Sequence, residues 1–234
     1  MKAEDQVRAA LGAGRHTLTE PEAKALFKSL GIPVPDGGVA NSAEDAADLA
    51  REIGPPVVAK VVSPDITHKT EAGGVVCPVA TAEDAAEAYE AIVGRVRSNC
   101  PEASIEGVLI EAFRPGGVEC VVGVRRDEAF GPVVMFGLGG VFVEVLGEVA
   151  FRLAPLTDGD VESMLGETRG SRCLDGFRGQ PAVDRAALAA VIKACAGIAT
   201  APGVGKLIGT LEINPLTASE NGVVALDGLV TLRP

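Results

Sequence analysis

The sequence predicts a mixed α+β protein (α/β type) built as two lobes with a cleft between them. Three observations support this: helical patterns alternate with short apolar runs in the first hundred residues, more β-rich runs follow, and hydrophobic residues make up 47% of the 234 residues. Such a chain can bury one large core or two smaller ones, and interleaved elements are typical of layered folds. We predict a polar leader (1–17), a smaller lobe (18–107) and a larger lobe (108–234).

The predicted helices have recognisable ends. Those in the first hundred residues cover 19–31, 42–54 and 81–98, and each starts with Ser or Thr followed by acidic residues. Ser and Thr cap helix N-termini, and the glycines that close the first two segments are typical helix stops. A later pair of helices is predicted at 156–167 and 183–200.

The predicted strands are short and apolar. The last two, at 206–216 and 222–232, are joined by TASENG, whose Asn-Gly step suits a tight reversal and predicts a hairpin. The other strands are predicted at residues 56–62, 73–79, 105–113, 118–125, 132–138 and 141–151.

Composition argues against several classes of protein. A formal net charge of −11 and 3% aromatic residues do not suit a surface that grips phosphate backbones or stacks bases, so no nucleic-acid partner is expected. The most apolar stretch, 133–151, is interrupted by glycines and glutamates, so neither a membrane span nor a signal peptide is predicted. Five widely spaced cysteines without a CxxC pair suggest reduced thiols in a cytoplasm.

Lys60 stands inside a continuous apolar run. PVVAKVV at 56–62 is typical of a strand buried on both faces, where an ammonium group needs an anionic partner. A buried charge without a partner costs several kcal/mol, which is a large share of a domain's stability. Two interpretations stay open here: an internal Lys–Glu pair or an amine that reaches the edge, and a lysine that binds an anionic ligand.

Two acids occupy similar positions. Glu111 in GVLIEAF and Glu119 in GVECVVGV lie among apolar neighbours eight positions apart. Together with Lys60 they favour a polar pocket, although strand alternation could turn each side chain outward. Polar groups that converge in an apolar cleft are what a nucleotide site requires.

A metal site is predicted on the closing hairpin. Asn214 in LEINPL and Asp227 in ALDG lie on its two strands, where opposite residues come within about 5 Å. Oxygen ligands of this kind suit Mg²⁺, which takes its remaining ligands from water and phosphate. The alternative is an Asn that caps a turn and an Asp in a loop.

His68 lies in the stretch SPDITHKTEAGGVV. Gly73 and Gly74 follow it just before a strand, and their backbone N–H groups could approach an anion without a Cβ in the way. A Gly-Gly pair and a loop histidine are weak signals when taken singly. With a metal pair downstream, they make a phosphate-handling role plausible.

These segments together resemble the β subunit of ADP-forming acyl-CoA synthetases of the acetate type, an ATP-grasp protein related to the β subunit of succinyl-CoA synthetase. The likeness runs from about Leu18 to the C-terminus. It is carried by LTEPEAKALFKSLGIPVP, PVVAKVVSPDITHKTEAGGV, DEAFGPVVMFGLGGVFVEVLGEVAFRLAPL, GFRG and LEINPL, in that order.

The resemblance implies an ATP-grasp fold that holds ATP or ADP between two lobes. It places Lys60 on the nucleotide phosphates, Glu111 at the strand that meets the adenine, and Glu119 near the ribose. It assigns Asn214 and Asp227 to Mg²⁺.

The resemblance also implies a phosphoryl relay. His68 falls on the histidine that is transiently phosphorylated in the family, and Glu212 falls on the acid thought to steady the phosphohistidine. The family commonly has E-x-D-x-N-P at the metal strand, whereas this chain has Thr210 in place of the first acid and the longer Glu212 in place of the Asp. A role that needs an acid at position 210 therefore cannot be carried over.

A separate α subunit is the partner that the resemblance implies. It would carry the CoA-binding domain and its own phosphorylated histidine, with two copies of each chain in the family, and would approach residues 136–151 and 176–179. Two alternatives remain: a self-sufficient ATP-grasp ligase that joins a carboxylate to an amine, which needs no histidine nucleophile, and a nucleotide-binding subunit without catalysis.

Overall fold

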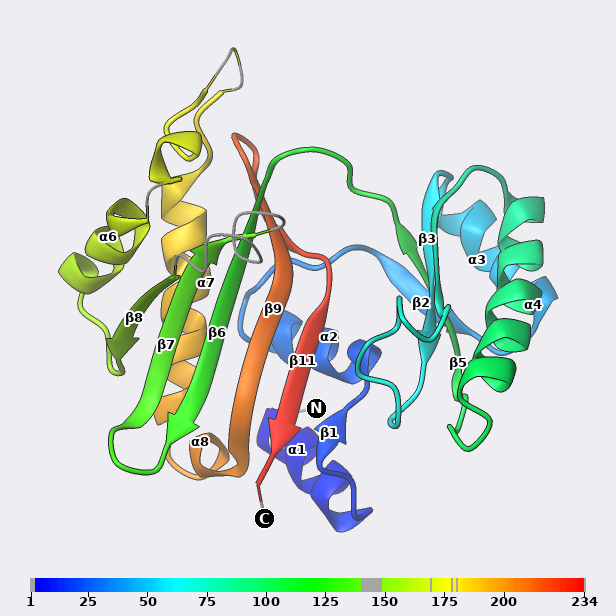
Figure 1. Ribbon diagram of the computed structural model, residues 1–234, viewed down its shortest axis with the longest axis horizontal. Helices are drawn as coiled ribbons and strands as arrows, with labels where there is room; N and C mark the ends of the chain where they lie inside the picture. The colour runs from blue at the N-terminus through cyan, green and yellow to red at the C-terminus, as the bar shows by residue number, and fades with distance from the viewer. Residues whose placement is uncertain (1–2, 140–148, 169, 178, 180, 234) are drawn as a thin grey trace. The chain divides into compact units, whose positions relative to one another are not determined.

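The computed structural model describes residues 3–139, 149–168, 170–177, 179 and 181–233, and all structural statements below concern these residues. They form two compact units, each of which contains its own sheet (Figure 1). The larger unit comprises the described residues of 1–18, 22–34 and 116–234, and the smaller unit comprises 19–21 and 35–115. The mixed α/β class is confirmed.

The smaller unit is an antiparallel sheet that packs against two helices. Its strands lie in the order β2–β5–β3–β4, and alanines and valines of the helices fill the core against the sheet. The strands are β2 (Gly37–Ala40), β3 (Val57–Val62), β4 (Val75–Val79) and β5 (Gly107–Ala112), and the helices are α3 (Ala43–Ile53) and α4 (Ala82–Asn99).

Helices α3 and α4 begin where the sequence predicts. The Ser42 hydroxyl accepts the backbone N–H of Asp45 at 3.0 Å, and the Thr81 hydroxyl accepts that of Asp84 at 3.0 Å. These bonds satisfy N–H groups that have no partner within the helix. Helix α3 ends at Gly54, whose φ of 87° is in the region that favours glycine.

Strand β3 is buried along its whole length, as predicted for a strand covered on both faces. Ala59 and Val61 belong to the core under the helices. Because side chains alternate along a strand, Lys60 between them points to the other face. The register pairs Lys60 with Leu109, so Glu111 is its diagonal neighbour on that face and lies within reach of a long side chain.

The larger unit is built on a second antiparallel sheet. Its strands run in the order β1–β11–β9–β6–β7–β8, with β10 also paired to β9. The strands are β1 (Thr17–Leu18), β6 (Val118–Asp127), β7 (Gly131–Leu138), β8 (Val149–Leu153), β9 (Ile208–Ser219), β10 (Gly222–Ala225) and β11 (Gly228–Leu232). The helices are α1 (Ala3–Gly12), α2 (Glu20–Ser29, whose residues 20–21 belong to the smaller unit), α6 (Asp158–Glu167), the 3-10 turn η1 (Ser171–Cys173), α7 (Arg185–Thr200) and α8 (Val204–Leu207).

Helix α7 packs on one face of this sheet, behind β6 and β7 in Figure 1. The predicted final hairpin is confirmed, since Ser219 pairs with Gly222 across its turn and both β10 and β11 pair with β9. The predicted strand at 141–151 lies largely outside the described residues, and β8 begins at Val149.

The N-terminal segment differs from a polar leader in one respect. Helix α1 buries Val7 and Ala10 in the core of the larger unit, because these apolar residues share one face of the helix. The predicted division of the chain at residues 17 and 107 stays a prediction. No helix in the described part of the chain is long and apolar enough to cross a membrane.

Candidate functional site

The predicted site residues fall into two groups, one in each compact unit. Lys60, His68, Gly73, Gly74 and Glu111 belong to the smaller unit. The larger unit holds the others, which are Glu119, Glu212, Asn214 and Asp227. Each group is described by itself below, and their convergence on one nucleotide stays a prediction.

Lys60 lies at the centre of a buried group of charges. Its Nζ atom is 2.6 Å from Glu111 Oε1 and 2.8 Å from Glu20 Oε1. The exposed fraction of the side chain is 10% for Lys60, 3% for Glu111 and 1% for Glu20. The internal Lys–Glu pair, one of the two interpretations left open by the sequence, is thus what the structure contains.

Lys69 extends this group. Its Nζ atom is 3.0 Å from Glu20 Oε2, and its side chain is 13% exposed. We call Glu20, Lys60, Lys69 and Glu111 the charge cluster. Sequence reasoning missed Glu20 and Lys69. An available signal was that a lysine in a core strand needs acidic partners, and Glu20 at the start of a predicted helix was one candidate.

The charge cluster also acts on a thiol of β4. Burial raises the pKa of Cys77 above its usual value, the positive charge of Lys60 lowers it, and the negative charge of Glu111 raises it. The three side chains belong to neighbouring strands, because β3 pairs with both β4 and β5. The charges of Lys60 and Glu111 therefore influence the pKa of Cys77 on the neighbouring strand.

His68 is an exposed residue of the loop that joins β3 to β4. The loop is folded on itself: the backbone N–H of Ala72 donates to the carbonyl of His68 at 3.3 Å, and Asn99 Nδ2 donates to the Ala72 carbonyl at 3.2 Å. Helix α4 thus fixes the end of the loop, while the imidazole stays accessible. This is the placement that a transient carrier of a chemical group requires.

The two glycines of this loop have structural reasons to be glycine. Gly73 has a φ of 74°, and a Cβ on Gly74 would lie 2.4 Å from Val61 Cγ1. Their N–H groups donate to the carbonyls of Thr70 at 3.0 Å and Lys69 at 2.7 Å. Since both N–H groups are used inside the loop, the cradle of open amides that we expected for an anion is not formed in this conformation.

Asn214 and Asp227 lie opposite each other, as the hairpin predicts. The backbone N–H of Asn214 donates to the Asp227 carbonyl at 3.2 Å. Asn214 is exposed, and its Nδ2 atom donates to Glu212 Oε1 at 3.2 Å. One oxygen of the Asp227 carboxylate accepts the N–H of Gly228 at 2.7 Å. This donor set of amide and carboxylate oxygens fits Mg²⁺, which needs only one or two protein ligands.

Glu119 lies on the same sheet as these residues. It is exposed and pairs with Thr217, while Gly123 further along β6 pairs with Glu212. Its neighbour Cys120 is buried in the core, so alternation turns Glu119 to the opposite face of the sheet. Glu212 and Asn214 also alternate with core residues on β9. The polar residues of this unit thus share the face that does not carry the core.

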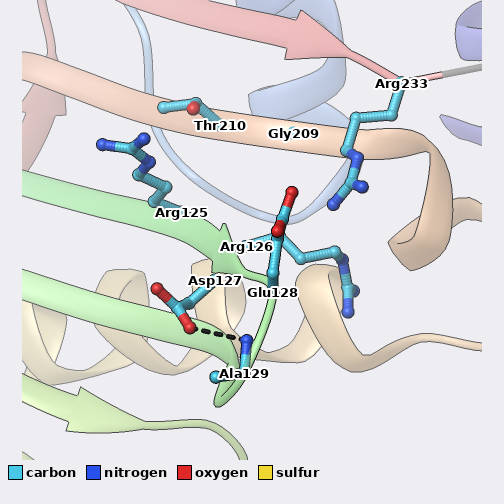
Figure 2. Close-up of a pocket in the computed structure, with 8 residues that line it drawn as sticks. All are labelled: Arg125, Arg126, Asp127, Glu128, Ala129, Gly209, Thr210 and Arg233. Atoms are coloured by element: carbon cyan, nitrogen blue, oxygen red, sulfur yellow. Dashed lines mark hydrogen bonds between the residues drawn. The ribbon is translucent and has the colours of Figure 1, made fainter.

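A pocket of about 670 Å³ lies at one end of β6 and β9, and none of the predicted site residues lines it. Figure 2 shows its lining: Arg125, Arg126, Asp127, Glu128, Ala129, Gly209, Thr210 and Arg233. The guanidinium of Arg126 donates to the carbonyls of Ala199 and Gly205, both at 2.7 Å, so this arginine joins the ends of two helices to the sheet. These hydrogen bonds indicate a structural role for Arg126.

Comparison with known proteins identifies the family. The ATP-grasp domain matches residues 9–232 of the chain. The chain belongs to the ATP-grasp family. The predicted ATP-grasp fold is therefore confirmed, and its two sheet-containing units agree with the two lobes expected of it.

Three relatives of this ATP-grasp protein are informative. It is 42% identical to the acetate–CoA ligase (ADP-forming) I subunit beta of Pyrococcus furiosus, over 94% of each chain. It is 37% identical to the longer acetate–CoA ligase (ADP-forming) I of Archaeoglobus fulgidus, of which the match spans 32%. The resemblance to β subunits of ADP-forming acetate-type synthetases is confirmed.

The third relative is acetyl-coenzyme A synthetase 1 of Candidatus Korarchaeum cryptofilum, which has been solved in several states. The structure with coenzyme A and Ca-AMPCP has a TM-score of 0.94 and 42% identity, covering 99% of this chain and all of that one. Another, with coenzyme A and Mg-AMPPCP and its phosphohistidine segment pointing towards the nucleotide-binding site, has a TM-score of 0.85 and 38% identity over the same coverage.

Proposed function

We propose that this ATP-grasp protein is the nucleotide-binding β subunit of an ADP-forming acetate-type acyl-CoA synthetase. The complete enzyme would convert acyl-CoA, ADP and phosphate reversibly into carboxylic acid, ATP and CoA. The observation that carries the proposal is the 42% identity to the Pyrococcus furiosus β subunit across 94% of both chains. An exposed histidine on a folded loop next to the charge cluster supports it.

His68 is the phosphoryl carrier in this proposal. The neutral imidazole would attack the phosphoryl group presented by the partner, so that a P–N bond forms as the bond to the donor breaks. The group would then pass to the terminal phosphate oxygen of ADP, with the P–N bond breaking as the new P–O bond forms. His68 would be regenerated for the next cycle, and Glu212 would steady the phosphohistidine near the nucleotide.

The remaining residues would hold the nucleotide. Lys60 would bind the phosphates, Glu111 would lie at the adenine and Glu119 at the ribose. Asn214 and Asp227 would hold Mg²⁺, which supplies positive charge to the transferring group when it is bound. Positioning and neutralisation of charge account for most of the catalysis of phosphoryl transfer, so these are the contributions required of the chain.

The proposed partner is an α subunit with a CoA-binding domain and its own phosphorylated histidine, in an assembly with two copies of each chain. The Pyrococcus furiosus relative is itself named as a subunit, and in Archaeoglobus fulgidus the matching region is part of a longer protein. We expect residues 136–151 and 176–179 near that partner, although 140–148 and 178 lie outside the described residues. A cytoplasmic location, suggested by the reduced cysteines, is part of the same proposal.

Phosphorylation of His68 tests the function directly. The chain would be incubated with Mg²⁺ and γ-labelled ATP, and the site of the label mapped by mass spectrometry at alkaline pH. We expect an acid-labile phosphate on His68, its complete loss in His68→Asn, and unchanged ATP binding by that variant. The control is His16→Asn, which removes the only other histidine, also exposed, and should keep full labelling.

Two results would refute the proposal. Label that persists in His68→Asn would show that the histidine is not the carrier. A wild-type chain that binds Mg-ATP but is never labelled, even with its partner present, would favour the carboxylate–amine ligase or the subunit without catalysis.

A further inference from the structure

One carboxylate joins the strand of Lys60 to the loop of His68. The two oxygens of Glu20 are divided between two lysines: Oε1 contacts Lys60 Nζ at 2.8 Å and Oε2 contacts Lys69 Nζ at 3.0 Å. The side chain of Glu20 is 1% exposed, so little solvent screens either contact. A single negative charge is therefore shared by two ammonium groups that lie nine residues apart in the chain.

The contact at Lys69 fixes the part of the loop that carries the histidine. Lys69 follows His68 directly, and its carbonyl accepts the N–H of Gly74 at 2.7 Å, which closes the loop. Its side chain is 13% exposed, whereas those of Thr67, His68 and Thr70 are exposed. Displacement of this segment would require the ion pair of Lys69 and Glu20 to break.

We propose that Glu20 is a positioning residue that couples the occupancy of Lys60 to the retention of the His68 loop. The inference rests on the proposed function, in which nucleotide phosphates bind Lys60. Phosphate groups compete with Glu20 for the ammonium of Lys60. When the ammonium of Lys60 binds phosphate, its attraction to Glu20 weakens, the contact between Glu20 and Lys69 becomes stronger, and the loop is held more firmly.

The coupling is reciprocal, because two sites linked through one equilibrium influence each other equally. If Lys69 is removed, Glu20 holds Lys60 more strongly and phosphates compete less well. If Glu20 loses its charge, the link disappears and Lys60 keeps only Glu111 as an acidic competitor among the contacts described above. A purely structural role for Glu20 would not predict these effects, because in them a substitution at Lys69 changes how strongly phosphates bind Lys60.

Tryptic cleavage after Lys69 reports on the ion pair, because trypsin must take the free lysine side chain into its specificity pocket. The variants are Glu20→Gln, which keeps the shape and removes the charge, and Glu106→Gln, which removes an exposed carboxylate of the same unit. Without nucleotide, Glu20→Gln should be cut at Lys69 at least fivefold faster than the wild type, and Glu106→Gln at the wild-type rate. Mg-ADP should slow the cut in the wild type at least threefold and have no effect on Glu20→Gln.

The outcomes separate this inference from the proposed function. Equal cleavage of the wild type and Glu20→Gln without nucleotide would overturn the role of Glu20, whatever the chain binds. If the two differ but Mg-ADP protects neither, calorimetry decides. Binding of ADP without protection would overturn the coupling, and no binding at all would refute the proposed function and, with it, the coupling.

A second measurement does not depend on the folding of Glu20→Gln alone. The affinity for Mg-ADP would be measured for the wild type, Lys69→Gln, Glu20→Gln and the double variant, with Glu20→Asp as the conservative replacement. We expect Lys69→Gln to weaken binding of Mg-ADP at least threefold when position 20 is Glu or Asp, and to have no effect when position 20 is Gln. An equal loss in all backgrounds would show a direct effect of the Lys69 charge and would overturn the coupling. Even if Glu20→Gln does not fold, an unchanged affinity of Lys69→Gln for Mg-ADP would overturn the coupling.

Discussion

Replacement of Lys60 by Met should strongly destabilise the chain. At 2.6 Å and 2.8 Å, the attraction of Lys60 to Glu111 and Glu20 is about 6 kcal/mol for each pair at an effective dielectric constant of about 20. Desolvation of the ions offsets much of this, and loss of one member of a buried pair typically costs about 3–5 kcal/mol. The cost arises because Glu111, whose side chain is 3% exposed, loses its ion pair with Lys60 at 2.6 Å.

The loss can be measured as a shift of the thermal midpoint. For a chain of this size, about 1 kcal/mol corresponds to roughly 2–4 °C, so the midpoint of Lys60→Met should fall by roughly 6–20 °C. The double variant Lys60→Met with Glu111→Gln also removes the charge of one of the two buried acids that lose Lys60, and should recover a large part of the loss. A midpoint within about 2 °C of the wild type in Lys60→Met, or no recovery in the double variant, would refute the argument from buried charge.

Three further predictions follow from the structure. Gly74→Ala should lower the free energy of unfolding, measured in urea titrations, by about 1–3 kcal/mol, because its methyl group would lie 2.4 Å from Cγ1 of the core residue Val61. As a control, Gly94→Ala, in open space on helix α4, should raise this free energy by about 0.5–1 kcal/mol. Asp227→Asn should weaken nucleotide binding at least tenfold in the presence of Mg²⁺ and leave metal-free binding unchanged, which calorimetry would show; equal loss in both conditions would contradict the metal role. Burial raises the pKa of the Cys120 and Cys195 thiols from 9.0 to about 12, so these thiols lose their protons at lower pH in the unfolded state than in the folded state. The free energy of unfolding, measured in urea, should therefore fall as the pH rises from about 9 to 12, and a variant with alanine at both positions should lose this slope. Both thiols should also resist alkylation at pH 8.

Patterns within one element predicted the fold well. Cap residues and early acids located α3 and α4, and the Asn-Gly step located the hairpin of β9 and β10, because these signals act between residues close in sequence. The segment before residue 17 was harder to interpret. Its charged residues hide a short apolar face, and only the packing of α1 on the larger unit shows that Val7 and Ala10 are core residues.

The candidate site was predictable as a set of residue types and less so as a set of contacts. A lysine in a core strand indicated that acids must be near, and Glu111 is one of them. Glu20 was missed because 40 residues separate it from Lys60, and no periodic pattern connects a helix start with a distant strand. The glycine pair was interpreted through open amides, but hydrogen bonds inside the loop use both of them.

The seclusion of Lys60 and Lys69 has a practical consequence for biosensor work. Amine-reactive reagents need accessible ammonium groups, and the exposed lysines at positions 28 and 206 offer better targets than two side chains that are 10% and 13% exposed and paired with carboxylates. The chain could thus be attached to a chip through its surface amines while the charge cluster is spared. Ligand titrations on such a chip would then be made with a chemically intact charge cluster.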